Sequence, residues 1–144
     1  MRRRGSEDGF TLVELMVVLV IISLAATAVV LAMPETGGSL EAEAERFAAR
    51  AKAARDSAIV EARPVALTID GGGYAVARRA SGAWHPISRH EWAEGTQAAL
   101  RGTIEGGTRF DSTGLAEPLH LTLNRRGRAV AVDIGPDGEV HVRR

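Results

Sequence analysis

Cysteine is absent from this 144-residue chain, which excludes a disulfide framework and a thiolate metal site. Aromatic residues are scarce, at 4% of the chain, so Val, Leu, Ile and Ala must supply most of any core. The chain also has no net charge, because 18 basic side chains balance 18 acidic ones, and a globally basic nucleic-acid binder is therefore not indicated. The length predicts one domain plus an anchor.

Charge is missing entirely from residues 15–33, a run of 19 residues. Counted from Phe10 to the end of that run, the apolar segment would form a helix of about 36 Å, at about 1.5 Å per residue, which exceeds the hydrocarbon core of about 30 Å. The arginine-rich start MRRRGSEDG (1–9) predicts a cytoplasmic N-terminus, with the soluble part across the membrane. In a diderm bacterium that space is the periplasm. A secretory signal has its cleavage site after the apolar run, whereas here a polar leader ends at Gly9, directly before it.

Helix breakers follow the apolar run and predict a hinge over 34–39 at the outer membrane face. These breakers are Pro34, Gly37 and Gly38. Ser39 is a candidate N-cap for an amphipathic helix over about 40–62, and Pro64 ends that helix. Its apolar stripe recurs every three or four residues, at Leu40, Ala44, Phe47, Ala51, Ala54, Ala58 and Ala62.

The pattern then changes to the alternation that is typical of strands. Strands are expected over 65–69, from Tyr74, over 119–124, 128–134 and 139–144, and more weakly over 100–105 and 108–110. Turns are expected at DGGG (70–73), Ser81-Gly82, RRG (125–127) and GPDG (135–138), whereas 88–99 is expected to be a loop. This pattern predicts an antiparallel sheet or sandwich with the helix covering one face.

A catalytic or metal-binding cluster is not evident in the sequence. The four histidines, His85, His90, His120 and His141, are scattered. His120 and His141 lie opposite the apolar face of their strands and are predicted to face solvent. The glycines at 71–73 precede a strand and not a helix, which disfavours a phosphate-binding loop. No catalytic residue, metal or cofactor is therefore predicted, and for Trp84 and Trp92 a place in the core is favoured over an interface.

Arginines cluster in one turn and at the C-terminus, at Arg125, Arg126, Arg128, Arg143 and Arg144. A solvated turn and terminus is the favoured interpretation. The alternative is a patch that meets phosphate or the acidic face of a partner.

Glu14 is the one acid within the apolar segment that starts at Phe10. A charge deep in lipid costs about 2.5–3.5 kcal/mol on insertion scales, and less near a helix end. Glu14 is thus either an interfacial residue of no significance or an acid that pairs with a cation inside an apolar assembly. Cleavage after Gly9 would create that cation, because Phe10 would gain an α-amino group that can meet Glu14 of a neighbouring subunit.

The order Gly9, FTLVE (10–14) and an apolar run resembles the processing motif of type IV pilin-like proteins, which include the pseudopilins of type II secretion. The resemblance implies that Gly9 precedes the prepilin peptidase cut, that Phe10 becomes the N-methylated first residue and that Glu14 is the assembly glutamate. Two departures concern the helix: Ser23 stands where many relatives have Gly, and Pro34 lies three residues later than the usual proline.

The stretch EAERFAARAKAARDSAIVEARPVALTID (43–70), followed by GGGYAV and SGAW, resembles the minor pseudopilins of the H type, the GspH/FimT-like family. The resemblance implies an α+β, type IV pilin-like fold, with a long N-terminal helix packed on an antiparallel β-sandwich. The implied segments are a cleaved leader (1–9), a transmembrane and assembly helix (10–33), a hinge (34–39), an amphipathic helix (40–63) and a periplasmic head (64–144).

The family role is structural and not enzymatic. It implies a single-pass inner-membrane protein that joins a periplasmic pseudopilus, between a tip of other minor pseudopilins and a shaft of the major pseudopilin. Prepilin peptidase and the inner-membrane secretion platform are further implied partners, and nucleic acid is not expected. Two alternatives remain: a minor pilin of a type IV pilus, serving adhesion, motility or DNA uptake, and an anchored enzyme or sensor.

Overall fold

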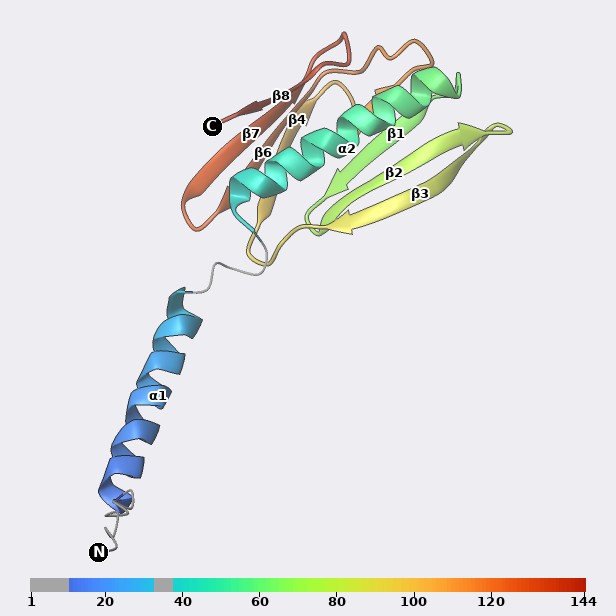
Figure 1. Ribbon diagram of the computed structural model, residues 1–144. Coiled ribbons are helices and arrows are strands. Elements are labelled where there is room, and N and C mark those ends of the chain that lie inside the picture. Colours follow the sequence, from blue (N-terminus) through green and yellow to red (C-terminus); the bar gives the residue numbers. More distant parts are fainter. Residues whose placement is uncertain (1–10, 33–37) are drawn as a thin grey trace, which may run out of the picture. The chain divides into compact units, whose positions relative to one another are not determined.

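The computed structural model describes residues 11–32 and 38–144, which form two separate compact units. The first is a single helix, α1 (Leu12–Ala32), and the second is a folded head (Figure 1). The predictions for Gly9, Phe10 and Pro34 lie outside the described residues, as does that for Gly37.

Helix α1 is apolar on all sides. Its stretch Leu12–Val29 has a mean hydropathy of 2.6 and is long and apolar enough to cross a membrane. The side chains of this stretch are exposed, from 41% at Val18 to 76% at Leu12 among the large apolar residues. Such a surface needs lipid or other apolar helices around it.

Helix α2 (Leu40–Val60) begins at the predicted cap, where Ser39 Oγ accepts a hydrogen bond of 3.1 Å from the backbone N–H of Ala42. Its end differs from the prediction of about residue 62. Ala62 has a φ of 49°, lies outside the helix and is exposed, so it does not belong to the apolar stripe. The buried face of α2 comprises Leu40, Glu43, Ala44, Phe47, Ala48, Ala51, Ala54 and Ala58.

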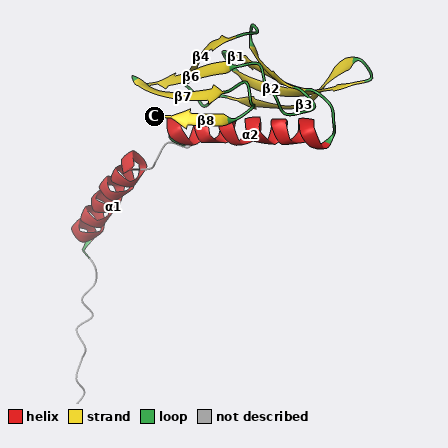
Figure 2. Cartoon of the chain, turned by 90° about the horizontal axis from the view of Figure 1, so that it is seen from above, coloured by secondary structure: helices red, strands yellow, loops and turns green. Residues whose placement is uncertain are grey.

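Two four-stranded antiparallel sheets complete the head. The first has the order β3-β2-β1-β5 and is formed by β1 (Val65–Asp70), β2 (Gly73–Ala80), β3 (Ala83–Glu91) and β5 (Gly107–Phe110). The second has the order β4-β6-β7-β8 and is formed by β4 (Gln97–Gly102), β6 (Leu119–Arg125), β7 (Arg128–Ile134) and β8 (Val140–Arg143). Figure 2 shows α2 on one side of the head and the strands of both sheets on the other.

The core lies between α2 and the sheets, because α2 contacts β1 and β5 of the first sheet and β6, β7 and β8 of the second. Alternate residues of β1 and β6 point inward and are buried, at Val65, Leu67, Ile69, Leu119, Leu121 and Leu123. The observed helix and antiparallel sheets confirm the predicted α+β class.

The loop predicted over 88–99 is wrong for most of its length. Strand β3 continues to Glu91 and β4 begins at Gln97, so the loop comprises only residues 92–96. Strand β3 lies at a sheet edge, and all but two of its residues are exposed. An edge strand without a buried face has no apolar alternation, and the sequence therefore lacked the signal.

Candidate assembly surfaces

The N-terminal end of α1 holds Glu14 in the first helical turn. Thr11 Oγ1 accepts a hydrogen bond of 3.2 Å from the backbone N–H of Glu14, which is the spacing of a capping box. A carboxylate here also interacts favourably with the positive end of the helix dipole. This role of Thr11 was not predicted, although the sequence pattern TLVE (11–14) carries the signal.

The hydroxyl groups of α1 are satisfied within the helix. Ser23 Oγ donates to Leu19 O at 2.8 Å, and Thr27 Oγ1 donates to Ser23 O at 2.9 Å. Ser23, one of the departures from the family pattern, therefore presents no unpaired donor to an apolar neighbour.

A buried ion pair anchors the start of α2. Glu43 and Arg125 have side chains that are 5% and 8% exposed, with 3.4 Å between Glu43 Oε2 and Arg125 Nη1. Glu43 also accepts hydrogen bonds from the backbone N–H of Ala93 at 2.6 Å and from Thr96 Oγ1 at 2.9 Å, while Arg125 Nη2 donates to Gly38 O at 2.7 Å. This network joins α2, β6 and the 92–96 loop.

Arg125 is therefore neither solvated nor part of a surface patch, which corrects both interpretations made from the sequence. Its position beside the β6–β7 turn resembles that of a solvated residue, but its side chain turns inward to the acid on the buried face of α2. The missed signal was Glu43 itself, because an acid three residues after Leu40 falls on the apolar stripe and needs a cationic or hydrogen-bonding partner.

The other predicted arginines are exposed, as expected. Three of them have acidic partners: Arg128 pairs with Glu41, Arg143 with Asp133, and Arg144 with Glu45 at 3.8 Å. These pairings balance much of the positive charge that a phosphate would need. They favour the solvated interpretation for these residues.

Asp133 lies on the outer face of the second sheet and also contacts His120, at 2.5 Å between Oδ1 and Nδ1. Burial alone would raise the pKa of Asp133, but hydrogen bonds from His120 and Arg143 outweigh it and hold that pKa below its usual range. The His120 side chain is 40% exposed and has this fixed partner, so it faces solvent only in part. His141 is exposed, as predicted.

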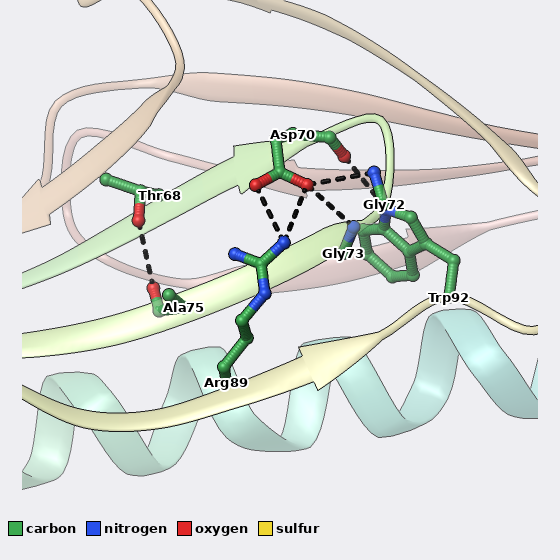
Figure 3. A network of polar contacts seen from close by, with 7 residues as sticks. All are labelled: Thr68, Asp70, Gly72, Gly73, Ala75, Arg89 and Trp92. Carbon is green, nitrogen blue, oxygen red and sulfur yellow. Dashed lines mark hydrogen bonds and ion pairs between the residues drawn. The ribbon is translucent and has the colours of Figure 1, made fainter.

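The β1–β2 turn carries a second polar network, drawn in Figure 3. Asp70 Oδ1 accepts hydrogen bonds from the backbone N–H groups of Gly72 at 2.8 Å and Gly73 at 2.9 Å, and Arg89 Nη2 reaches both carboxylate oxygens. Trp92 Nε1 donates to Asp70 O at 3.1 Å. Asp70 thus ties the hairpin turn to strand β3 and to the residue that follows it.

Trp92 is buried and packs with Phe47 and Tyr74, at ring-centroid distances of 5.9 and 5.0 Å, which confirms its predicted place in the core. Trp84 is 37% exposed on β3, so the same prediction is wrong for it. The difference follows from position, because Trp92 comes directly after β3 and packs against α2 and β2, whereas Trp84 lies within the exposed edge strand.

The described residues contain no group of three or more His, Asp or Glu side chains that could hold a metal ion. A cleft of about 570 Å³ is lined by residues of α2, β2 and β3, including Arg50, Tyr74 and His90. Burial raises the pKa of Tyr74. These residues form no arrangement of nucleophile, base and orienting acid such as hydrolytic catalysis requires.

An apolar helix followed by a head of one helix and two antiparallel sheets is the arrangement of the type IV pilin-like fold. The minor pseudopilin EpsH from the type 2 secretion system of Vibrio cholerae superposes with a TM-score of 0.63 at 17% identity, over 72% of this chain and 94% of that one. The type IV minor pilin FimU of Pseudomonas aeruginosa superposes with a TM-score of 0.61 at 18% identity, over 73% and 88%.

Sequence comparison is more specific. Residues 4–30 match the prokaryotic N-terminal methylation motif, and residues 43–138 match the family of the type II transport protein GspH. The type II secretion system protein H of Pseudomonas aeruginosa is 32% identical over 90% of this chain and 91% of its own length. That of Aeromonas hydrophila is 36% identical over 55% of this chain and 44% of its own. The chain belongs to the GspH family.

Proposed function

We propose that this protein is a minor pseudopilin of a type II secretion system, a structural subunit of a periplasmic pseudopilus that aids the export of folded proteins. The proposal rests on one observation: the same chain has a GspH-family head and an apolar helix that bears the N-terminal methylation motif. The role is structural, and the chain is a substrate of the processing enzyme and not itself an enzyme.

The proposed maturation starts with prepilin peptidase, which cuts between Gly9 and Phe10 and leaves Phe10 as the N-methylated first residue. The chain then crosses the inner membrane once through α1, with the head in the periplasm. Removal of the leader takes away the charged extension that precedes α1. The mature chain then begins one residue before Thr11, whose side chain caps the helix.

Assembly then rests on two properties of α1. Its exposed apolar side chains can pack against helices of neighbouring subunits. Glu14, held in the first turn by the Thr11 cap, can accept the positive terminus of an adjacent Phe10. In surroundings of low dielectric such a pair is strongly coupled, and a mismatch leaves an unpaired charge, so the pair would set the axial register of the subunits.

The proposed neighbours are the other minor pseudopilins of the tip and the major pseudopilin of the shaft. The inner-membrane secretion platform would contact the subunit during assembly. The segment 34–39 would serve as the hinge between anchor and head.

A minor pilin of a type IV pilus is the second candidate, and the fold shared with FimU supports it. It is less favoured, because the curated relatives are type II secretion proteins and because the arginines that could contact DNA are largely paired or buried.

Deletion of the gene in its own host separates the two candidates. Type II secretion predicts that exoproteins accumulate in the periplasm while twitching motility and DNA uptake are unchanged, and that the wild-type gene restores secretion. Normal secretion with lost twitching or DNA uptake would instead establish the pilin role.

A further inference from the structure

The outer face of the first sheet carries an exposed tryptophan between two arginines. Trp84 on β3 lies opposite Arg79 on β2, and Arg109 lies on β5 at the other edge of the sheet. The Cζ atoms of Arg79 and Arg109 are 5.7 and 5.8 Å from the centre of the Trp84 ring. We name these three residues the Arg–Trp–Arg surface.

The strand registers explain how residues from three strands meet. Ala66 of β1 pairs with Ala77 of β2 on one side and with Arg109 of β5 on the other. Val65 and Leu67 point into the core, so Ala66 points outward. The small side chains of Ala66 and Ala77 leave room for the long side chains at the edges to reach across the sheet.

Both guanidinium groups are held in place and still have free hydrogen-bonding edges. A cation–π contact fixes the plane of an arginine without using its N–H donors. Among residues 11–32 and 38–144, neither Arg79 nor Arg109 has a carboxylate partner for its side chain. Their neighbours differ, because Arg78 pairs with Glu61 and Arg89 pairs with Asp70.

We propose that the Arg–Trp–Arg surface is a docking site for an acidic segment of a partner protein. Two fixed guanidinium groups match carboxylates in bidentate geometry, and their order reduces the entropy lost on binding. Tryptophan and arginine are also the residues most enriched among interface hot spots. The balanced charge of the whole chain favours a protein segment over a nucleic acid, which needs an extended basic surface.

The proposal goes beyond the proposed role in secretion and does not depend on it, because its test measures binding in a purified protein. The full chain is purified in non-ionic detergent, and fluorescence anisotropy follows a labelled peptide of six glutamates. The double variant Arg79→Gln/Arg109→Gln is expected to weaken binding at least tenfold. The matched control Lys52→Gln/Arg101→Gln removes the same charge from exposed positions elsewhere and is expected to weaken binding less than twofold.

Two further variants test the geometry. Arg79→Lys/Arg109→Lys keeps the charge but loses the bidentate edges and is expected to weaken binding several-fold, and Trp84→Ala is expected to do the same while Trp84→Phe retains binding. Thermal unfolding of each variant checks that the head remains folded.

Several results would overturn the proposal. One is that the two glutamine double variants weaken peptide binding equally, which would mean that the peptide binds through non-specific charge attraction. Another is tighter binding of a single-stranded oligonucleotide than of the glutamate peptide. A third is a self-association of the wild-type chain that Arg79→Gln/Arg109→Gln abolishes, because the occupant would then be a second copy.

Discussion

Glu43 and Arg125 show how one residue pair decides the position of several segments. Their contacts join the first turn of α2 to the end of β6 and to the 92–96 loop. Sequence patterns placed Arg125 in a solvated turn because they follow neighbours along the chain. The pairing depends on a side chain 82 residues away, which no local pattern contains.

We expect Glu43→Ala to destabilise the head by about 3 kcal/mol or more, because breaking a buried pair leaves a buried charge without compensation. The backbone N–H of Ala93 and the hydroxyl of Thr96 would lose their acceptor as well. Urea unfolding of the purified chain, followed by near-ultraviolet circular dichroism, measures the loss.

The control is Glu45→Ala, which removes an exposed partner of Arg144 on the same helix and should cost less than about 1 kcal/mol. Equal losses of stability for the two variants would show that the buried pair contributes no more to the free energy of unfolding than an exposed pair.

At the level of helices and strands, the sequence predicted what depends on periodicity. The stripe of α2 and the alternation in β1, β6 and β7 gave these elements and the α+β class, because a buried face repeats at the period of its element. It did not predict β3 as a strand through Glu91, since this edge strand has little buried surface. It also placed the end of α2 too late, because alanine favours a helix, whereas Ala62 adopts the left-handed conformation that is typical of glycine.

Two glycines of the β1–β2 hairpin differ in their surroundings. A side chain at Gly73 would lie 2.1 Å from His90 O, on the adjacent strand β3, whereas a side chain at Gly71 would have nothing within 4 Å. We therefore expect Gly73→Ala to lower stability by about 1–3 kcal/mol, as overpacking does.

Gly71→Ala is the matched control and should have a much smaller effect. The same urea titration compares the two. A Gly73→Ala variant as stable as Gly71→Ala would show that β3 moves aside without cost.

The turn also predicts a pH dependence of stability. The hydrogen bond from Arg89, followed by those from the backbone of Gly72 and Gly73, holds the pKa of Asp70 below its ordinary value of 3.8, although desolvation acts in the opposite direction. A carboxylate with a lowered pKa in the folded state stabilises it above pH 3.8, and this stability is lost as the pH falls through the folded-state pKa.

Asp70→Asn should therefore melt at a lower temperature than the wild type at pH 6, and the difference should shrink below pH 3.8. Melting temperatures between pH 2 and pH 7 test this. A difference that stays constant over that range would contradict the assigned cause, because the other carboxylates are common to both proteins.

The whole chain combines two units that need different surroundings. The head buries its own apolar residues, whereas the large side chains of Leu12–Val29 remain exposed. The sequence predicted this division, because hydropathy and length suffice to recognise an apolar helix. It did not predict the Arg–Trp–Arg surface, which depends on strands that are distant in sequence.

Gly9→Ala should block maturation, because the proposed peptidase site requires glycine before the cut. Intact mass of the membrane-extracted protein should then show the full chain, including residues 1–9. Gly5→Ala, within the same leader, is the control and should be processed normally. A Gly9→Ala protein whose N-terminus still begins at Phe10 would refute the proposed cut.

We propose that α1 is an anchor that becomes a filament contact through the charge of Glu14. The test is to measure the amount of Glu14→Gln protein in sheared pseudopilus fractions relative to the wild type, with processing to Phe10 verified by mass in the same cells. Gln keeps the shape and removes the charge, and Glu45→Gln, which removes an exposed carboxylate from the head, serves as the control. We predict normal processing but at least about tenfold less Glu14→Gln protein in the filaments, the ratio that corresponds to about 1.4 kcal/mol. Incorporation of Glu14→Gln at the wild-type level would contradict the claim.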